Sequence, residues 1–107
     1  MNIINLTPHA LRLLAEDGKT VATEIQPSGQ IARVAAKAVL VGHAGAVPLY
    51  HTEYGAVEGL PEPQPETIYV VSGLVRAAVP HREDVYSPGR LVRDDQGRPV
   101  GAIGLTR

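Results

Sequence analysis

The chain has 107 residues and carries ten Lys or Arg against eleven Asp or Glu, which gives a formal net charge of −1. This balance lacks the basic excess of nucleic-acid-binding proteins, and no apolar run reaches the ~18 residues of a membrane-spanning helix. The absence of cysteine excludes disulfides, thiolate metal sites and cysteine nucleophiles. We therefore expect no nucleic-acid partner, no membrane partner and, since no signal peptide is evident, a cytoplasmic location.

The length predicts one domain that covers residues 1–107. The chain contains no Phe, no Trp and one Met, so its core must come from aliphatic side chains and four tyrosines. Aromatic side chains normally supply much of the buried area, and their scarcity indicates a thin core. We expect a homo-oligomer, because a subunit interface would add the burial that such a core lacks.

One short strand and one strand pair are expected in the first quarter of the chain. Residues 3–6 form a short apolar strand that Thr7-Pro8 ends. Residues 11–14 and 21–25 alternate in polarity, and Asp17-Gly18 between them supplies the positive φ of a tight turn. These two runs predict a β-hairpin.

The middle of the chain predicts short strands that glycines interrupt. Residues 31–34 and 38–41 are strand-like, and the glycines within 42–45 break the chain after them. Residues 47–50 and 55–57 predict a further pair of strands around the polar residues 51–54.

A stiff connector leads from there to the most apolar strand. The prolines of residues 60–66 hold that segment extended across the surface. Residues 68–71 lack polar alternation, which is typical of a central strand covered on both faces. Ser72 is a good N-cap for a short helix over 74–79, which Pro80 ends.

The chain closes with a second hairpin. Residues 90–94 and 98–105 flank an Asp-Asp-Gln-Gly turn whose Gly97 suits a left-handed position. The expected fold class is therefore α+β and β-rich. It has a small mixed or antiparallel sheet, which could be barrel-like, with hairpins at both ends and one short helix after a central strand.

The stretch from Thr67 to Gly89 is where a buried strand leads directly into charged and turn-forming residues. Binding residues concentrate in loops on rigid scaffolds, so we expect a ligand site here. Backbone N–H groups at the helix start would attract an anion, and two arginines would neutralise it. The predicted ligand-binding residues are Ser72, Gly73, Arg76, Arg82 and Asp84, with Arg33, His9 and Tyr69 as second-rank candidates.

The alternative for this stretch is structural. Arg82 and Asp84 would then pair with each other, and Ser72 would only cap the helix. No nucleophile elbow, phosphate-binding loop or metal-ligand spacing occurs in the chain. We expect no catalytic residue, no metal and no cofactor.

Several short segments of the sequence resemble those of a family of short, uncharacterised bacterial and phage-borne proteins. The resemblance spans nearly the whole chain but brings no activity with it. It rests on Asn2 to Ala10, Pro27-Ser28-Gly29, Ala32-Arg33, Gly59-Leu60-Pro61, Tyr69 to Ser72, Pro80, Arg82, Asp84, Pro88-Gly89, Arg93-Asp94 and Gly97. By analogy with small phage proteins, it implies that the chain could counter host defence by sequestering a nucleotide signal or binding a defence protein.

The first functional hypothesis is a non-enzymatic binding protein for an anionic, nucleotide-like small molecule. The second is a protein–protein inhibitor or adaptor module that binds a host protein by strand addition, using the proline-rich edge. The third is a small hydrolase that uses His81 and Asp84. The expected partners are thus a small anionic ligand, a host protein and further copies of the chain.

Overall fold

The computed structural model describes residues 1–107, with eight strands and one helix. Strands hold 54% of the chain and the helix 6%, which confirms the β-rich α+β class. The elements are β1 Asn2–Asn5, β2 Leu11–Leu14, β3 Val21–Ile25, β4 Arg33–Ala44, β5 Val47–Glu58, β6 Thr67–Val70, α1 Gly73–Ala78, β7 Val85–Arg93 and β8 Pro99–Thr106. No helix is long and apolar enough to cross a membrane.

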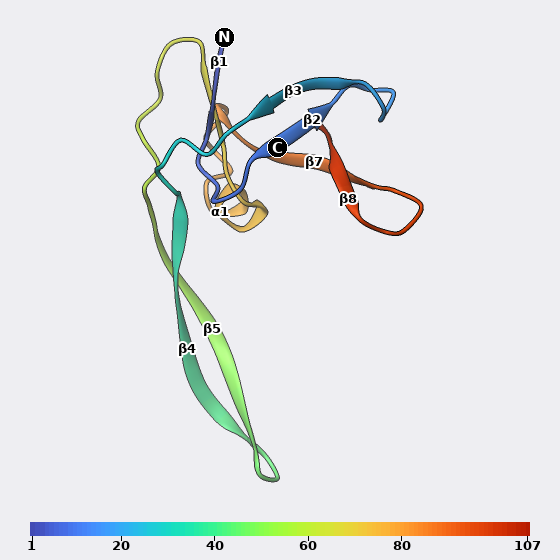
Figure 1. Cartoon of the computed structure of the whole chain (residues 1–107). Coiled ribbons are helices and arrows are strands. Elements are labelled where there is room, and N and C mark those ends of the chain that lie inside the picture. Colours follow the sequence, from blue (N-terminus) through green and yellow to red (C-terminus); the bar gives the residue numbers. More distant parts are fainter.

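Six strands form a mixed sheet, which we call the body together with α1. Their order is β1-β6-β7-β8-β2-β3, with parallel pairing of β1, β6 and β7 and antiparallel pairing within β2–β3 and β7–β8. Figure 1 shows that this sheet curves round into a nearly closed, barrel-like form. The two predicted hairpins are both present and lie side by side through the parallel β2–β8 pairing.

Asn5 links the two edges of the body sheet. It ends β1, and its side-chain amide donates to the Ile25 carbonyl at the end of β3 over 3.2 Å and to the His9 carbonyl over 2.7 Å. Its Oδ1 accepts from the Thr7 backbone N–H at 2.9 Å and from the Thr7 hydroxyl at 2.6 Å. Asn5 is almost fully buried, so these bonds satisfy polar atoms that water cannot reach.

The core is small and lies under α1 and β6. Its seven buried residues include no charged side chain, and Ile4, Val34, Val57 and Leu60 pack against its margin. β6 has neighbours on both sides, as its unbroken apolar run predicted. The core residues are Leu6, Ala32, Tyr69, Val71, Val75, Val79 and Val85.

β4 and β5 form a separate two-stranded hairpin, which we call the arm. It projects away from the body as a long twisted ribbon (Figure 1). The radius of gyration is 16.8 Å, whereas a compact chain of this length has about 13 Å. The extents of 51 × 40 × 23 Å show the same departure from a compact shape.

The arm corrects two sequence predictions. Residues 51–54 are not a turn between short strands but lie in the middle of the twelve-residue strand β5. Gly42 does not break the chain either, because it lies in β4 next to a register shift. The reversal is instead a two-residue turn after the Ala44–Val47 pair, where Gly45 has a φ of 63°. Glycine at the first position of such a turn fits the tight hairpin geometry.

Candidate binding surfaces

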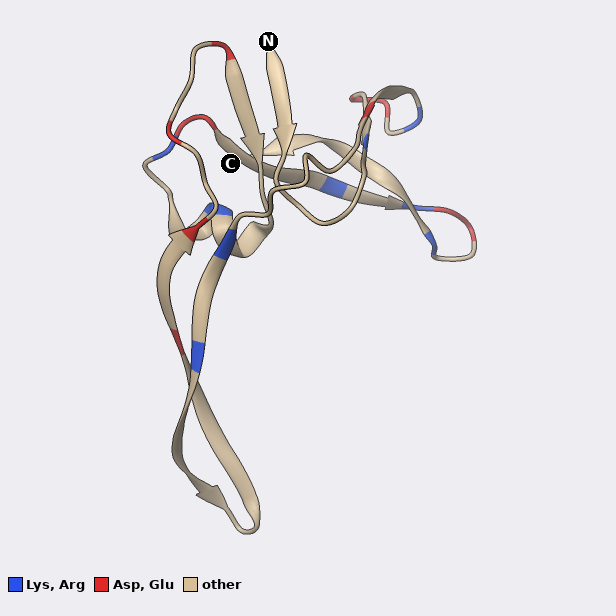
Figure 2. Cartoon of the chain, turned by 60° about the vertical axis from the view of Figure 1, so that its left-hand side comes forward, with Lys and Arg blue, Asp and Glu red and all other residues tan.

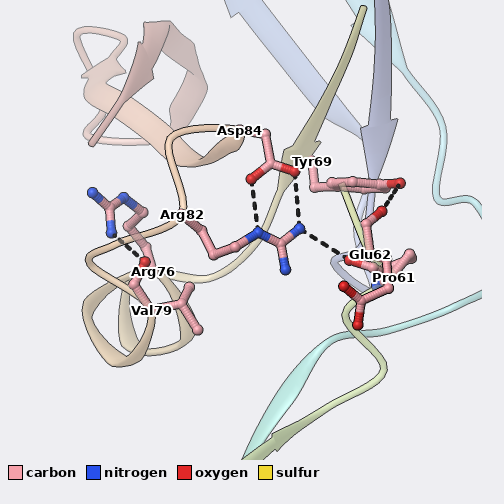
Figure 3. A network of polar contacts seen from close by, with 7 residues as sticks. All are labelled: Pro61, Glu62, Tyr69, Arg76, Val79, Arg82 and Asp84. Atoms are coloured by element: carbon pink, nitrogen blue, oxygen red, sulfur yellow. Dashed lines mark hydrogen bonds and ion pairs between the residues drawn. The ribbon is translucent and has the colours of Figure 1, made fainter. Parts of the chain in front are cut away.

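Arg82 and Asp84 form a two-pronged ion pair in the loop between α1 and β7 (Figure 3). The Arg82 Nε donates to Asp84 Oδ1 at 2.8 Å, and its Nη2 donates to Oδ2 at 2.9 Å. The Nη2 also donates to the Pro61 carbonyl at 3.0 Å. Such paired bonds between planar groups are among the stronger polar contacts in proteins. Arg82 thus ties its own loop to the proline-rich connector.

The two charges stabilise each other. The hydrogen bonds from Arg82 hold the pKa of the Asp84 carboxyl below its ordinary value, against the opposing effect of burial. Asp84 in turn raises the pKa of the Arg82 guanidinium. Both side chains are mostly shielded from solvent, so water screens their attraction only in part. This arrangement matches the structural alternative stated for Arg82 and Asp84.

Tyr69 secures the same connector from the core side. Its ring is 1% exposed, and its hydroxyl donates to the Glu62 carbonyl at 3.2 Å. The carbonyls of Pro61 and Glu62, next to each other in the chain, therefore each accept a side-chain bond from the body (Figure 3). Prolines remove backbone donors from this segment, so side-chain bonds take the place of a strand ladder.

Ser72, Gly73 and Arg76 lie around the start of α1. The Ser72 hydroxyl accepts from the Val75 N–H at 3.3 Å, so Ser72 is the N-cap that the sequence predicts. Gly73 faces open space, since a Cβ there would meet no atom within 4 Å. Arg76 donates through Nη1 to the Val79 carbonyl at 3.3 Å, while its buried Nε has no hydrogen-bond partner.

Figure 3 places the Arg76 guanidinium on the opposite side of the Arg82 backbone from the Arg82–Asp84 pair. The structure thus brings Arg82, Asp84 and Tyr69 together around the connector, with Arg76 pointing away from them. The two hollows described below do not involve this cluster: one is lined mainly by β2, β7 and β8 residues and the other by arm residues.

Two predicted site residues stand apart from this cluster. Arg33 is exposed at the root of the arm, where it opposes Glu58 in the β4–β5 register. His9 has an exposed side chain and contributes its backbone carbonyl to the Asn5 and Thr7 bonds. The Asn-Leu-Thr-Pro-His opening thus has a structural explanation, because it closes the body sheet.

The hydrolase hypothesis requires Asp84 to orient His81. Both Asp84 carboxylate oxygens already accept bonds from Arg82, and His81 lies exposed in the preceding turn. The Ser72 hydroxyl is likewise engaged as a helix cap. The contacts of these groups therefore serve the loop's own structure.

The arm exposes a large apolar surface. Residues 38–52 contain no Asp, Glu, Lys or Arg, and the lower part of the arm in Figure 2 carries no charged residue. Six large apolar residues of β4 and β5 have between 44% and 64% of their surface exposed. They are Leu40, Val41, Val47, Leu49, Tyr50 and Tyr54.

Both faces of the arm are apolar near its tip. Opposed residues of a hairpin share a face, and faces alternate along each strand. The pairs Leu40–Tyr50 and Ala36–Tyr54 therefore lie on one face, with Ala38–Thr52 between them. The other face carries Val39 opposite His51 and Leu49 opposite Gly42. Two of the four tyrosines in the chain thus lie on this exposed ribbon.

The body carries a shallow apolar groove, which we call the β2–β8 groove. Its volume is about 320 Å³, and Arg12 is its only charged lining residue. The Arg12 Nε lies 3.4 Å from Oε1 of Glu24 on the neighbouring strand β3. Leu91, which is half-exposed, lines the groove from β7. A second hollow of about 260 Å³ lies at the arm, between Lys37 and Tyr54.

Comparisons with known proteins add no relative: no family model matches the chain, and neither the curated proteins nor the solved structures contain a significant match.

Sequence reasoning missed the arm as one long exposed hairpin. Two signals were present: a charge-free run over residues 38–52 and two tyrosines four residues apart. A charge-free, strand-like run that glycine divides in two indicates a hairpin that needs a covering partner.

Proposed function

We propose that this protein is a non-enzymatic binding module that holds another polypeptide chain through its arm. The observation that carries the proposal is the fifteen-residue charge-free segment of an exposed hairpin. This is the adaptor or inhibitor hypothesis, with the arm in place of the proline-rich connector as the binding element. The connector is already fastened to the body by Arg82 and Tyr69.

The energetics of an isolated arm support this proposal. A two-stranded hairpin is at best marginally stable in water, and the arm adds no third strand or covering helix. Proteins usually protect exposed strand edges with lysine, proline or other charged residues. Residues 38–52 of the arm contain only one such residue, Pro48. A surface that is both apolar and unprotected is typical of an interface.

The residue types also suit binding. Tyrosine is among the residues that dominate binding energy at interfaces, and Tyr50 and Tyr54 both stand on one face of the arm. The outer edges of β4 and β5 offer backbone donors and acceptors to a further strand. A partner chain could therefore combine edge pairing with apolar contact.

A photo-crosslinking amino acid at position 50 tests this proposal in expressing cells. A benzophenone side chain there should yield a covalent adduct with a polypeptide, while the same group at exposed Gln96 in the β7–β8 turn should yield none. Denaturing gels and mass spectrometry report the mass added to the chain. The absence of any polypeptide adduct at position 50, with the chain folded, would overturn the proposal.

A second candidate function is the binding of an anionic, nucleotide-like molecule next to α1. The observation that favours it is the buried Arg76 Nε without a hydrogen-bond partner, because such groups are rare in folded proteins and call for an explanation. A phosphate oxygen could accept from this group, and the exposed Gly73 would leave room for it.

Thermal shift measurements with inorganic phosphate, nucleoside triphosphates and cyclic dinucleotides test this second candidate. One class should stabilise the wild-type protein and the Arg98→Gln control but not Arg76→Gln. Arg98 is a suitable control because it lies in the distant β7–β8 turn. Equal shifts in the two variants, or no shift with any ligand, would remove Arg76 from a ligand site.

A further inference from the structure

We infer that the chain that covers the arm is a second copy of this protein, whose β2–β8 groove receives the arm tip in a reciprocal exchange. This inference rests on the proposed function and names its partner. The arm presents an uncharged apolar tip, and the body of the same chain presents an apolar groove with one charged residue. The two surfaces match in chemistry.

The distribution of side chains on the arm favours insertion over stacking of two arms. Stacking would cover one face, such as that of Leu40 and Tyr50. It would leave Val39 and Leu49 of the opposite face in water. A tip that is apolar on both faces is covered more completely by insertion. One face then lies in the groove, and the other face contacts the surrounding interface.

The dimensions allow such an exchange. Each arm strand has twelve residues, which correspond to about 40 Å at the usual rise of a strand. This length lets the tip reach across a partner's body while the root stays attached to its own. The groove volume of about 320 Å³ accommodates one or two large side chains, such as Tyr50 and its neighbour Leu40.

The buried area would reach that of a stable dimer. The six large side chains of one arm expose on the order of 600 Å², and a standard interface buries about 800 Å² on each partner. If the facing body covers the whole of each arm, with the groove taking one or two of the six side chains, the two contacts would bury on the order of 2,000 Å² in total. The contact closes on itself through a two-fold axis, so it produces a dimer and not a fibre.

The inference also explains the thin core. Only 15 of the 107 residues are buried, and just 11 of these are hydrophobic. A small domain of this kind gains stability when a partner copy covers further apolar surface. Half-exposed Leu91 at the groove and the arm side chains would complete a core that one copy alone does not close.

Engineered cysteines test the contact directly, because the natural chain has none. Tyr50→Cys and Leu91→Cys proteins are prepared separately, mixed and oxidised under mild conditions. A disulfide-linked heterodimer of the two variants is the expected main product. If Tyr50→Cys links mainly to itself, the arms stack against each other and the groove inference is wrong.

Light scattering and native mass spectrometry measure the association itself. The wild-type protein should be a dimer, and Leu40→Glu should weaken dimerisation roughly 30-fold or more because a charge enters an apolar contact. Leu74→Glu on α1 is the matched control, since Leu74 and Leu40 are 50% and 52% exposed. It should leave the dimer intact.

The outcomes separate this inference from the proposed function. A monomer at all concentrations, combined with a foreign protein crosslinked at position 50, would overturn the second copy as partner and keep the arm as a binding element. A monomer with no adduct at position 50 would overturn both. Equal dimerisation of Leu40→Glu and wild type would also overturn the inference.

Discussion

The body and the arm differ in how their strands are paired. In the body, six strands pair in one sheet, and one side-chain bond from Asn5 to the Ile25 carbonyl joins its two ends, while three more hold the turn at Thr7 and His9. In the arm, two strands of twelve residues pair only with each other and expose apolar side chains on both faces. The body sheet is therefore nearly closed within one copy, whereas the arm leaves apolar side chains exposed.

This difference separates the residues that stabilise the fold from the proposed binding surface. Residues of the predicted site between Thr67 and Asp84 act largely to fasten loops to the body, through Tyr69, Arg82 and the Ser72 cap. The arm contributes few buried contacts to its own copy. Substitutions should therefore damage folding in the body and association in the arm.

Replacing one tyrosine of the body and one of the arm by alanine should give the largest difference in stability between the two regions. Tyr69→Ala removes a ring that is 1% exposed and leaves a carbonyl of the connector without its donor. We expect the free energy of unfolding to fall by about 4 kcal/mol, which approaches the whole stability of a small domain. Tyr54→Ala should change it by less than about 1 kcal/mol at concentrations where the chain is monomeric.

Denaturant titrations of both variants at low protein concentration check this contrast. Near-equal losses would mean that the arm packs into its own copy and is not a free surface. At high concentration, the loss for Tyr54→Ala should grow if the proposed dimer forms, because association stabilises the folded state by mass action.

The Arg82–Asp84 pair gives a smaller effect with a defined pH dependence. The pKa of Asp84 is lowered from 3.8 by its hydrogen bonds with Arg82, so the carboxylate contributes stability that is present above that value. This contribution is lost as the pH falls through the lowered pKa. Asp84→Asn should cost about 2 kcal/mol at pH 7, the usual scale of a hydrogen bond to a charged group.

Unfolding measured from pH 7 down to pH 2 tests that sign. The stability difference between wild type and Asp84→Asn should be constant near neutral pH and shrink below about pH 4. Asp95→Asn in the exposed β7–β8 turn is the control and should leave the stability at pH 7 close to that of the wild type. A gap that widens in acid would contradict the assigned role of the pair.

Much of the body could be predicted from the sequence because its signals are local. Asp17-Gly18 and the Asp94 to Gly97 turn specify the two hairpins, and the unbroken apolar run of β6 indicates its central place. Ser72 and Pro80 set the limits of α1 to within one residue of the prediction. The order of the strands could not be predicted, since it depends on contacts between residues far apart in the chain.

The candidate site was harder to predict for a related reason. A charged cluster in a loop has the same sequence pattern whether it binds a ligand or its own backbone. Arg82 donates to Asp84 and to the Pro61 carbonyl. Pro61 lies 21 residues away in the chain, so no local sequence pattern indicates that contact. The arm was missed because glycine and histidine at residues 42–45 suggested a break, whereas only Gly45 lies in a turn.

The smallest expected effect concerns that turn. Gly45 has a φ of 63°, a region that costs an L-residue with a side chain roughly 1–2 kcal/mol. A Cβ at this position would meet no atom within 4 Å, so strain and not collision decides the outcome. Gly45→Ala should therefore loosen the arm tip and leave the body unchanged. Hydrogen exchange checks this: amides of β4 and β5 near the tip should exchange about tenfold faster in the variant, while amides of β6 and β7 keep the wild-type rate. Equal acceleration in both regions would mean that the arm and the body unfold as one unit, which would end the distinction between them.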